Sequence, residues 1–240
     1  MFEPKFYRRG LNIKDLFEFE VKIGETDMLI RANSDLSKIA FKFTRFLRYQ
    51  IQKYVKLHSF FLRSLEPIEV DVEAPKIIQA MQAASIKAGV GPMAAVSGAL
   101  AEFLGNGLRE KSPEIIIENG GDIYLNSSKK RLVQIYAGAS RLSKKIAIEV
   151  KPEDSPLGIC TSSRTVGHSL SFGIADACCV IAKSACLADA FATALGNSIK
   201  SEYSIDKILN SFGVYKEILG MVVIVKEKLA CVGNIELIRI

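Results

Sequence analysis

Apolar and polar residues alternate along two short segments near the start of the chain. The segments are 17–24, FEFEVKIG, and 26–32, TDMLIRA. A period of two places one set of side chains on a buried face and the other set in water, which is the pattern of a half-buried β-strand. Because the two segments meet at Gly24-Glu25, they predict a β-hairpin.

A long helical repeat follows the hairpin. Asn33-Ser34-Asp35 has the composition of a helix N-cap, and the repeat runs from there to about Leu65. The predicted apolar face comprises Ile39, Phe43, Leu47, Ile51, Tyr54, His58 and Phe61. A second, basic stripe comprises Lys38, Lys42, Arg45, Arg48, Lys53 and Lys56. This stripe fits the solvated side of an amphipathic helix, and we expect His58 to be a core histidine.

Further helices and a run of strands complete the pattern. Helices are predicted from Pro75 to about Gly89 and over 93–108, a segment rich in Ala and Gly. Strands are predicted at 114–118, 122–126, 132–138, 145–150, 158–162 and 178–182. The remaining elements are a helix around Asp189, a short helix near 204–211, and strands at 221–227 and 229–240. Single strands and helices do not alternate, so the pattern predicts an α+β fold and not a Rossmann fold.

Composition and charge narrow the class of protein. The chain has 240 residues, of which 49% are hydrophobic, and a net charge of +6, compatible with an anionic ligand or with a basic surface. Its five cysteines form an odd set without a Cys-x-x-Cys pair, which argues against a disulfide framework and a zinc site. We expect free thiols in a reducing cytoplasm. The sequence shows no export signal, and no apolar run predicts a membrane partner.

One predicted helix carries a charge that neither a core helix nor a solvated helix explains. From Ser184 to Ile199, Asp189 is the only charged residue, and the others are mostly small or apolar. Thr193 follows one helical turn later and shares its face. A carboxylate that leaves water is costly unless a cation, a set of hydrogen-bond donors or bulk solvent compensates it.

Several explanations of Asp189 remain open. Ser184 has the composition of an N-cap, so the carboxylate would lie near the start of its own helix, although in the second turn, where the dipole has weakened. It could instead pair with a distant Lys or Arg, or lie exposed. A carboxylate and a hydroxyl one turn apart are also suitable oxygen ligands for Mg²⁺.

A glycine turn provides a second group of candidates. Residues 118–123, ENGGDI, predict a strand, a tight turn and a strand. Asn119, Gly120 and Gly121 tolerate the positive φ angles of such a turn, so a plain β-hairpin explains them. Glycines without side chains also let a ligand reach the main chain beside Asp122.

A hydroxyl-rich loop provides a third group. Residues 160–173, CTSSRTVGHSLSFG, place Thr161, Ser162, Ser163 and Arg164 ahead of His168. Hydroxyl groups and an arginine among glycines suit a phosphate or pyrophosphate, and a polar surface loop is the alternative. His168 is either a general base or an ordinary loop residue.

Taken in order, these motifs resemble those of the FAD:protein FMN transferase superfamily, the ApbE-like proteins. Members show an Asn-x-Gly-Gly-Asp-Ile turn, a Thr-Ser-Gly loop before a histidine, and an Ala-Asp-Ala-x-Ala-Thr-Ala-Leu helix. The similar segments here are 118–123, 161–168 and 188–195, together with 98–101, where Glu102 follows in place of the usual Lys. The resemblance is clearest over 85–235. It implies one ApbE-like domain over 1–240, built from duplicated β-β-α units of the T-fold type with a mixed or antiparallel sheet.

The resemblance also implies a function and a set of roles. Such enzymes use Mg²⁺ to split the pyrophosphate of FAD, join FMN to a Thr or Ser hydroxyl of an acceptor protein, and release AMP. By the resemblance, Asp189 and Thr193 would be the metal ligands, helped by a main-chain carbonyl near Gly98, and His168 would deprotonate the acceptor hydroxyl. The residues that would bind the nucleotide are Asn119, Gly120, Gly121, Asp122, Thr161, Ser162 and Ser163.

The sequence departs from the flavin transferases after His168. Those enzymes typically carry Asp-Pro-x-Thr-Gly there, and this chain has Ser-Leu-Ser-Phe-Gly at 169–173. In this it resembles the compact cytoplasmic branch of the superfamily, for which a link to sulfur assimilation has been suggested. The alternative function is therefore flavin or nucleotide binding in the same pocket without FMN transfer. A nucleic-acid partner is not expected, because it would leave Asp189 and the glycine turn without a role. A homo-oligomer is compatible with the sequence.

Overall fold

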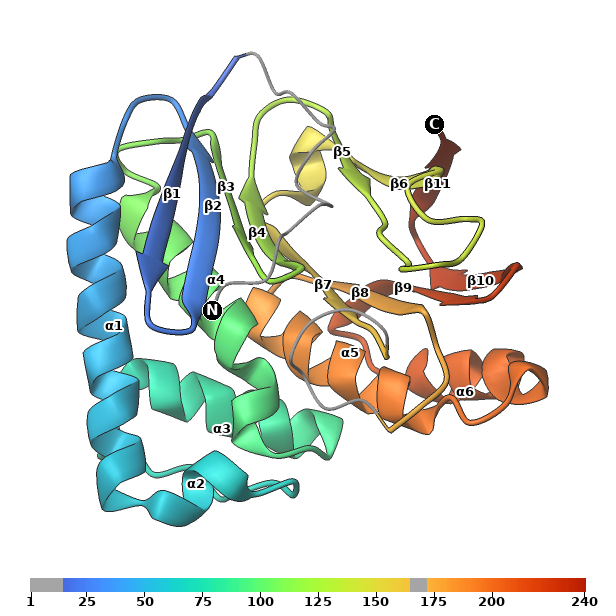
Figure 1. Ribbon diagram of the computed structural model, residues 1–240, viewed down its shortest axis with the longest axis horizontal. Helices are drawn as coiled ribbons and strands as arrows, with labels where there is room; N and C mark the ends of the chain where they lie inside the picture. The colour runs from blue at the N-terminus through green and yellow to red at the C-terminus, as the bar shows by residue number, and fades with distance from the viewer. Residues whose placement is uncertain (1–14, 165–171) are drawn as a thin grey trace.

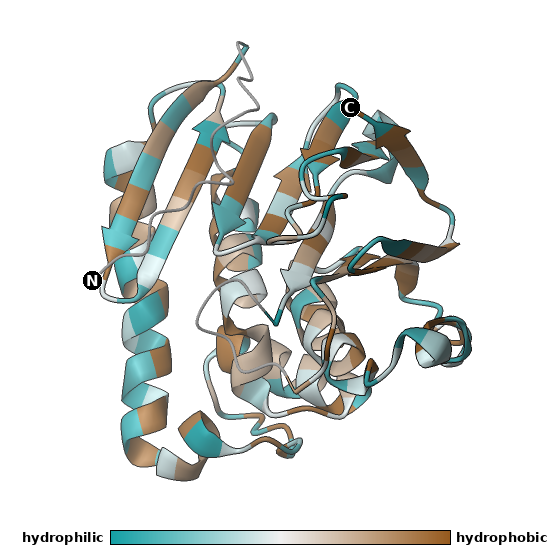
Figure 2. Ribbon diagram, turned by 45° about the vertical axis from the view of Figure 1, so that its right-hand side comes forward, coloured by the Kyte–Doolittle hydropathy of each residue, from teal (hydrophilic) through white to brown (hydrophobic). Residues whose placement is uncertain are grey.

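An eight-stranded antiparallel sheet forms the centre of the computed structural model, which describes residues 15–164 and 172–240 (Figure 1). Its strand order is β1-β2-β3-β4-β7-β8-β9-β10. The bounds are β1 Phe17–Ile23, β2 Thr26–Ala32, β3 Ile115–Asn119, β4 Asp122–Asn126, β7 Leu157–Ser162, β8 Ala177–Ala182, β9 Ile218–Val225 and β10 Lys228–Gly233. The predicted N-terminal hairpin is β1–β2, and the alternating hydropathy along β1 is visible in the ribbon of Figure 2.

A second, three-stranded sheet lies against one face of the large one. It has the order β11-β6-β5, with β5 Arg131–Gln134, β6 Ile146–Val150 and β11 Glu236–Arg239. The prediction of one strand over 229–240 was wrong. The chain turns at Gly233, where φ is +104°, so that β10 pairs with β9 and β11 crosses to pair with β6. A glycine can adopt this conformation without strain, and the two sheets therefore share the C-terminal segment.

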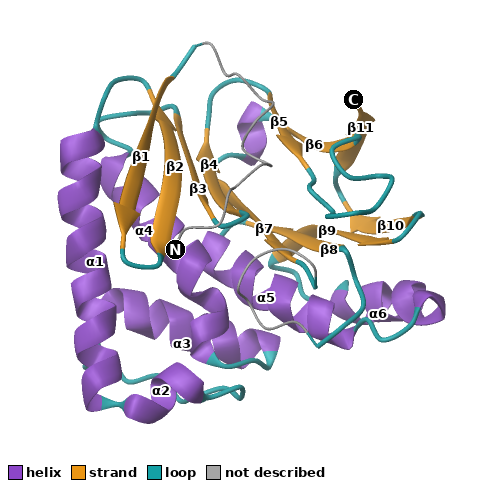
Figure 3. Ribbon diagram, viewed as in Figure 1, coloured by secondary structure: helices purple, strands orange, loops and turns teal. Residues whose placement is uncertain are grey.

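The helices lie on the other side of the large sheet (Figure 3). They are α1 Ser37–Leu57, α2 Ser59–Arg63, α3 Lys76–Ala88, α4 Val96–Leu108, α5 Ala185–Ser198 and α6 Ile205–Phe212. Short 3₁₀ turns are η2 Pro92–Ala95, η3 Pro152–Asp154 and η4 Glu202–Ser204. Within the described ranges, no single helix is long and apolar enough to cross a membrane. Only α3 with η2–α4 passes such a test as a pair, and it is bent by 107°.

The helix predicted from the N-cap cluster to Leu65 is interrupted at His58, so that prediction was wrong in its length. His58 leaves the helical conformation, with φ −126° and ψ 71°, and its ring stacks on Tyr54 at 4.2 Å. Its Nδ1 lies 3.2 Å from the Tyr54 carbonyl oxygen. The break turns the chain so that Phe61 becomes fully buried against Tyr54. His58 is only half-buried, so it packs at the edge of the core and not, as predicted, within it.

The buried stripe of α1 also differs from the prediction. Ile39 is 42% exposed, whereas Ala40, Thr44, Leu47, Ile51 and Tyr54 are the buried residues. The helix packs along a line that includes the small side chains of Ala40 and Thr44, which lets it approach its neighbours closely. A prediction that selects large apolar residues leaves out such small side chains. The Lys residues of the basic stripe and Arg45 are exposed, as predicted. Arg48 is the exception, because its side chain is only 12% exposed and pairs with Glu25 at 2.7 Å.

The large sheet repeats one arrangement twice. A hairpin, a group of helices and a second hairpin occur in the order β1-β2, α1 to α4, β3-β4, and again as β7-β8, α5-α6, β9-β10. This is the duplicated unit expected from the resemblance, and the sheet pairings within the described residues are antiparallel. The helices bury one hydrophobic core beneath the sheet, and the three-stranded sheet buries a smaller one above it.

Candidate functional site

Asp189 lies in the helical layer, where α5 meets the first turn of α4. Its side chain is buried, and one carboxylate oxygen accepts the main-chain N–H of Gly98 at 2.8 Å. The N–H of Ser97 donates a second hydrogen bond to the same carboxylate. A Cβ on Gly98 would lie 2.2 Å from the Ala185 carbonyl oxygen and 2.8 Å from Asp189 Cβ. The glycine therefore allows the close approach that lets the main chain of α4 bind the carboxylate.

Asp189 is stabilised by the dipole of α4 and not, as considered from the sequence, by that of its own helix α5. Ser184 is the N-cap of α5, as predicted, and its Oγ accepts the N–H of Leu187. Asp189 lies beyond this first turn, but it stands at the N-terminus of α4, which begins at Val96. The free N–H groups and positive end of that helix stabilise a negative charge. The carboxylate thus has a set of donors, and among the described residues part of its hydrogen-bonding capacity is unused.

Asp122 is a second buried carboxylate, at the start of β4. The main-chain N–H of Thr161 donates a hydrogen bond to it. The neighbouring Cys160 thiol donates to the Ala185 carbonyl oxygen at 3.3 Å. Burial and then the nearby charge of Asp189 raise the pKa of Asp122 well above its usual range. Burial also raises the pKa of Asp189, against the opposing effect of its hydrogen bonds from Gly98 and Ser97. Two carboxylates therefore repel one another in a region with little water.

The glycine turn joins β3 to β4 beside this pair. Gly120 and Gly121 have φ of +72° and +104°, so the turn uses glycine for its conformation, as the hairpin explanation requires. The turn is also tied to α4, because Asn119 Nδ2 donates to the Ser97 carbonyl oxygen at 3.1 Å. Gly121 N–H donates to Glu118 at 2.7 Å. The main chain at Ser97 is therefore held on one side by Asn119 and on the other by Asp189.

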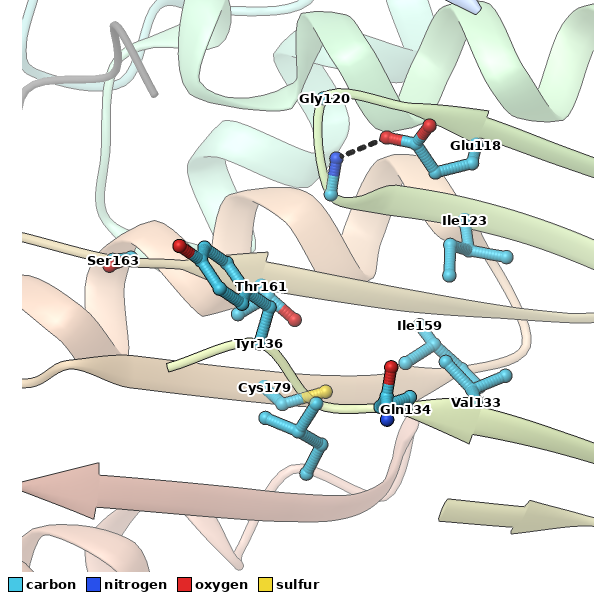
Figure 4. A pocket seen from close by; sticks show the side chains of 12 residues that line it. Glu118, Gly120, Ile123, Val133, Gln134, Tyr136, Ile159, Thr161, Ser163 and Cys179 are labelled. Carbon is cyan, nitrogen blue, oxygen red and sulfur yellow. Dashed lines mark hydrogen bonds between the residues drawn. The ribbon is translucent and has the colours of Figure 1, made fainter. Parts of the chain in front are cut away.

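A pocket opens on the opposite face of the sheet, beneath the segment that follows β5 (Figure 4). It holds about 680 Å³ of empty space, its mouth included. Thr161 and Ser163 supply hydroxyl groups, and Tyr136 lies across the pocket near them. The full lining is Glu118, Gly120, Gly121, Ile123, Val133, Gln134, Ile135, Tyr136, Ile159, Thr161, Ser163 and Cys179. These described residues include no Lys, Arg or His, so the lining suits an uncharged planar ring better than a phosphate.

Successive residues of the hydroxyl-rich segment lie on opposite faces of the sheet, because side chains alternate along a β-strand. Cys160 belongs to the core on the helical side and Ile159 to the core between the sheets. The same alternation places Ser162 on the helical side and Thr161 in the pocket. Ser163 follows the strand and lines the pocket as well, while Arg164 is exposed.

The remaining candidates are only partly placed. Thr193 is half-buried on α5, one turn after Asp189. His168 lies outside the described residues, so the structure does not place the predicted general base. Of the sequence candidates, Asn119, Asp122 and Asp189 meet on the helical side, and Gly120, Gly121, Thr161 and Ser163 line the pocket.

The donor set fits a hard divalent cation. Within residues 15–164 and 172–240, no group of three or more His, Cys, Asp or Glu side chains could hold a metal by itself. Asp122 and Asp189 supply carboxylate oxygens, and Thr193 follows Asp189 by one turn on α5. A site with few protein ligands is typical of Mg²⁺, and a divalent charge would relieve the repulsion between the buried carboxylates.

Several residues of this region were missed by sequence reasoning. Ser97 acts through main-chain groups, which carry no side-chain signal. Gly98 was expected to supply a carbonyl oxygen, whereas in the structure its N–H donates to Asp189. Tyr136 lies in a segment predicted to be a plain strand, and β5 in fact ends at Gln134. The period of the strand was the one sequence signal for how the site is divided, because it places Cys160 and Thr161 on opposite faces of the sheet.

Comparison with known proteins decides the family. A family model described as "AbpE bacteria" matches residues 8–210. The chain belongs to this family. Among its relatives, a UPF0280 protein of Methanocaldococcus jannaschii is 39% identical in an alignment of 230 positions that covers 93% of each chain. A UPF0280 protein of Methanococcus vannielii is 40% identical in an alignment of 227 positions that covers 92% of each chain.

Solved ApbE structures share the fold. The flavin transferase ApbE from Vibrio cholerae is 12% identical, with a TM-score of 0.53, and the match covers 91% of this chain and 97% of that one. The ApbE protein from Thermotoga maritima is 11% identical, with a TM-score of 0.63 and coverage of 90% and 96%. At such identities the likeness shows the fold alone. The ApbE-like family and the α+β class predicted from the motifs are confirmed.

Proposed function

We propose that this ApbE-like protein is a Mg²⁺-dependent enzyme that acts on a flavin nucleotide. The observation that carries the proposal is the buried pair Asp122–Asp189, which lies beside a glycine turn whose other face opens into a ring-sized pocket. A strongly perturbed carboxylate pair next to a pocket is typical of a functional site. The likeness to solved flavin transferases supports a flavin as the ligand.

The proposed reaction is FMN transfer. The hydroxyl of a Ser or Thr on an acceptor protein attacks the phosphorus of the FMN half of FAD. A new phosphoester bond forms, the P–O–P bond breaks, and AMP leaves. Mg²⁺ would neutralise the charge of the pyrophosphate when bound. His168, in the role that the resemblance assigns to it, takes the proton of the attacking hydroxyl.

The residues of the site have distinct proposed roles. Asp189 and Thr193 hold the metal, and Asp122 adds a second carboxylate to that side. Asn119 fixes the turn to α4 through Ser97, and the glycines give the nucleotide access to the main chain. The hydroxyl groups of Thr161, Ser162 and Ser163 are hydrogen-bonding groups for the nucleotide. The five free cysteines agree with a reducing cytoplasm as the place of action.

Calorimetric titration with FAD, FMN and ADP, with and without Mg²⁺, tests the proposal. We expect FAD binding that requires Mg²⁺ and that is lost in Asp189→Ala. Asp206→Ala is the matched control, because Asp206 lies on α6, is exposed and pairs only at the surface with Lys228. No binding of any of the three nucleotides would refute the proposal. Binding of FAD without AMP release, in the presence of acceptor proteins, would favour the alternative of a flavin-binding protein without transferase activity.

A further inference from the structure

The helices α4 and α5 each present a carboxylate to the start of the other. Glu102, on α4, uses Oε2 to accept the Ser184 hydroxyl at 2.7 Å and the Cys186 main-chain N–H at 2.9 Å. Asp189, on α5, accepts the main-chain N–H groups of Ser97 and Gly98 in the first turn of α4. The two helices are therefore capped reciprocally, each by an acidic residue of its neighbour.

This reciprocal arrangement leaves little freedom at the start of α5. Ala185, its first residue, packs against two glycines. A Cβ on Gly98 would lie 2.2 Å from the Ala185 carbonyl oxygen, and a Cβ on Gly158 would lie 2.2 Å from Ala185 Cα. The start of α5 is thus held between α4 and β7, and Glu102 supplies the hydrogen bonds that complete the junction.

We propose that Glu102 is a positioning residue that fixes the carboxylate of Asp189 through the first turn of α5. Glu102 touches neither Asp122 nor Asp189 in the described contacts. It acts on the site through Ser184 and Cys186, which precede Asp189 by five and three residues. A rigid helix transmits this constraint, because Asp189 follows Cys186 by less than one turn. The expected effect of Glu102 on metal binding rests on the proposed function. The coupling between the two helix caps does not rest on it.

Hydrogen exchange and metal titration of matched variants test the proposal. Glu102→Ala removes both hydrogen bonds, and Glu102→Gln retains an acceptor oxygen in the same place. Tyr124→Phe is the control, since it removes one hydrogen bond to α4 at its far end, from Tyr124 Oη to Asn106 at 2.9 Å. Amide exchange is followed at residues 97, 98, 186 and 187. Mn²⁺ binding, measured by electron paramagnetic resonance, serves as the metal probe.

In Glu102→Ala we expect exchange to rise about tenfold at all four amides and Mn²⁺ affinity to fall about tenfold, the effect of losing one helix cap. In Glu102→Gln, the exchange rates and the Mn²⁺ affinity should both stay within about threefold of the wild-type values. Tyr124→Phe should change neither the exchange rates nor the Mn²⁺ affinity. Faster exchange at 186 and 187 alone would overturn the proposal, since the first turn of α4 would then be independent of Glu102. Equal losses in the Gln and Ala variants would also overturn it.

Two outcomes separate this inference from the function on which it rests. If the wild-type protein does not bind Mn²⁺, the proposed function fails, and exchange at residues 97 and 98 still decides whether the caps are coupled. If Glu102→Ala does not fold, Ser184→Ala replaces it. This variant removes one of the two donors to Glu102 and also the N-cap bond to Leu187, so only exchange in α4 is compared. We expect a smaller rise, about threefold, at residues 97 and 98, and no change there would overturn the proposal.

Discussion

Two groups of buried carboxylates in this protein have opposite surroundings. Glu114 lies beside Arg131, whose guanidinium nitrogen is 3.0 Å from its carboxylate, and accepts the Ser128 main-chain N–H at 2.7 Å. Burial opposes its charge, but hydrogen bonds from Ser127, Ser128 and Arg131 outweigh this effect and hold its pKa at about 2. The charge of Glu114 is therefore compensated within the protein itself.

Asp122 and Asp189 have no such cation. Among the described residues, neither forms an ion pair with Lys or Arg, and their hydrogen-bond donors are main-chain N–H groups. Their pKa values are raised and not lowered. The difference teaches that Glu114 is part of a structural network, whereas the aspartate pair has no cation among the described residues and is the place where we propose that a ligand supplies positive charge.

The largest effect is expected from disturbing the main-chain donors of the pair. Gly98→Ala places a methyl group 2.2 Å from the backbone oxygen of Ala185, where no flexible side chain can yield. We expect the free energy of unfolding to fall by about 3 kcal/mol, as for an overpacked core. Gly213→Ala is the control, because its Cβ would make ordinary contacts. Chemical denaturation measures both, and an unchanged midpoint for Gly98→Ala would contradict this packing.

Asp122→Asn removes one charge of the pair and nearly preserves its shape. We expect Mg²⁺-dependent FAD binding to weaken at least about tenfold, while the metal-free protein becomes more stable by about 1 kcal/mol at pH 8 because the repulsion is lost. The sign follows from the raised pKa values: the pair contributes stability at low pH and loses it as the pH rises above the usual aspartate range. Thermal unfolding without metal at pH 4 and pH 8 checks this. A metal-free variant less stable than the wild type at pH 8 would show that the charges are compensated.

Tyr136→Ala separates the pocket from the carboxylate pair. Tyr136 is half-buried and lies across the pocket, with Lys144 Nζ 5.5 Å from the centre of its ring. Loss of the aromatic surface should weaken FAD binding about tenfold. FMN binding measured without Mg²⁺ should weaken by a similar factor, because the pocket does not depend on the metal. Calorimetry decides this, and unchanged affinity would place the flavin elsewhere.

The smallest effect is expected in the compensated network. Glu114→Gln should lower stability by about 1 kcal/mol at pH 7, because glutamine keeps an acceptor oxygen for the same donors. The pKa of Glu114 is lowered from 4.5 to about 2, so its contribution is complete above pH 4.5 and is lost as the pH falls towards 2. The variant and the wild type should therefore converge in acid. Urea unfolding between pH 2 and 7 measures the difference, and a constant gap would rule out a role for this titration.

The strands and most helices follow from local patterns, because alternation and helical spacing are properties of neighbouring residues. The motifs at 118–123 and 188–195 were visible for the same reason, and they led to the correct family. The break at His58 and the split after Gly233 were not visible. Both depend on what the chain packs against: the core around Phe61 in one case and the edge of β6 in the other.

The sequence by itself determined that Asp189 was exceptional, since it is the only charge in an apolar helix. It left open whether the partner was a cation, a donor set or solvent. The tertiary structure decided this, because the donors are main-chain groups of Ser97 and Gly98, about ninety positions away and without any side-chain signature. Asp122, Asp189 and the two helix starts meet only when both halves of the sheet fold over one helical layer. The electrostatics of the site are therefore a property of the assembled fold, because charge interactions depend on distance in space and not on separation along the chain.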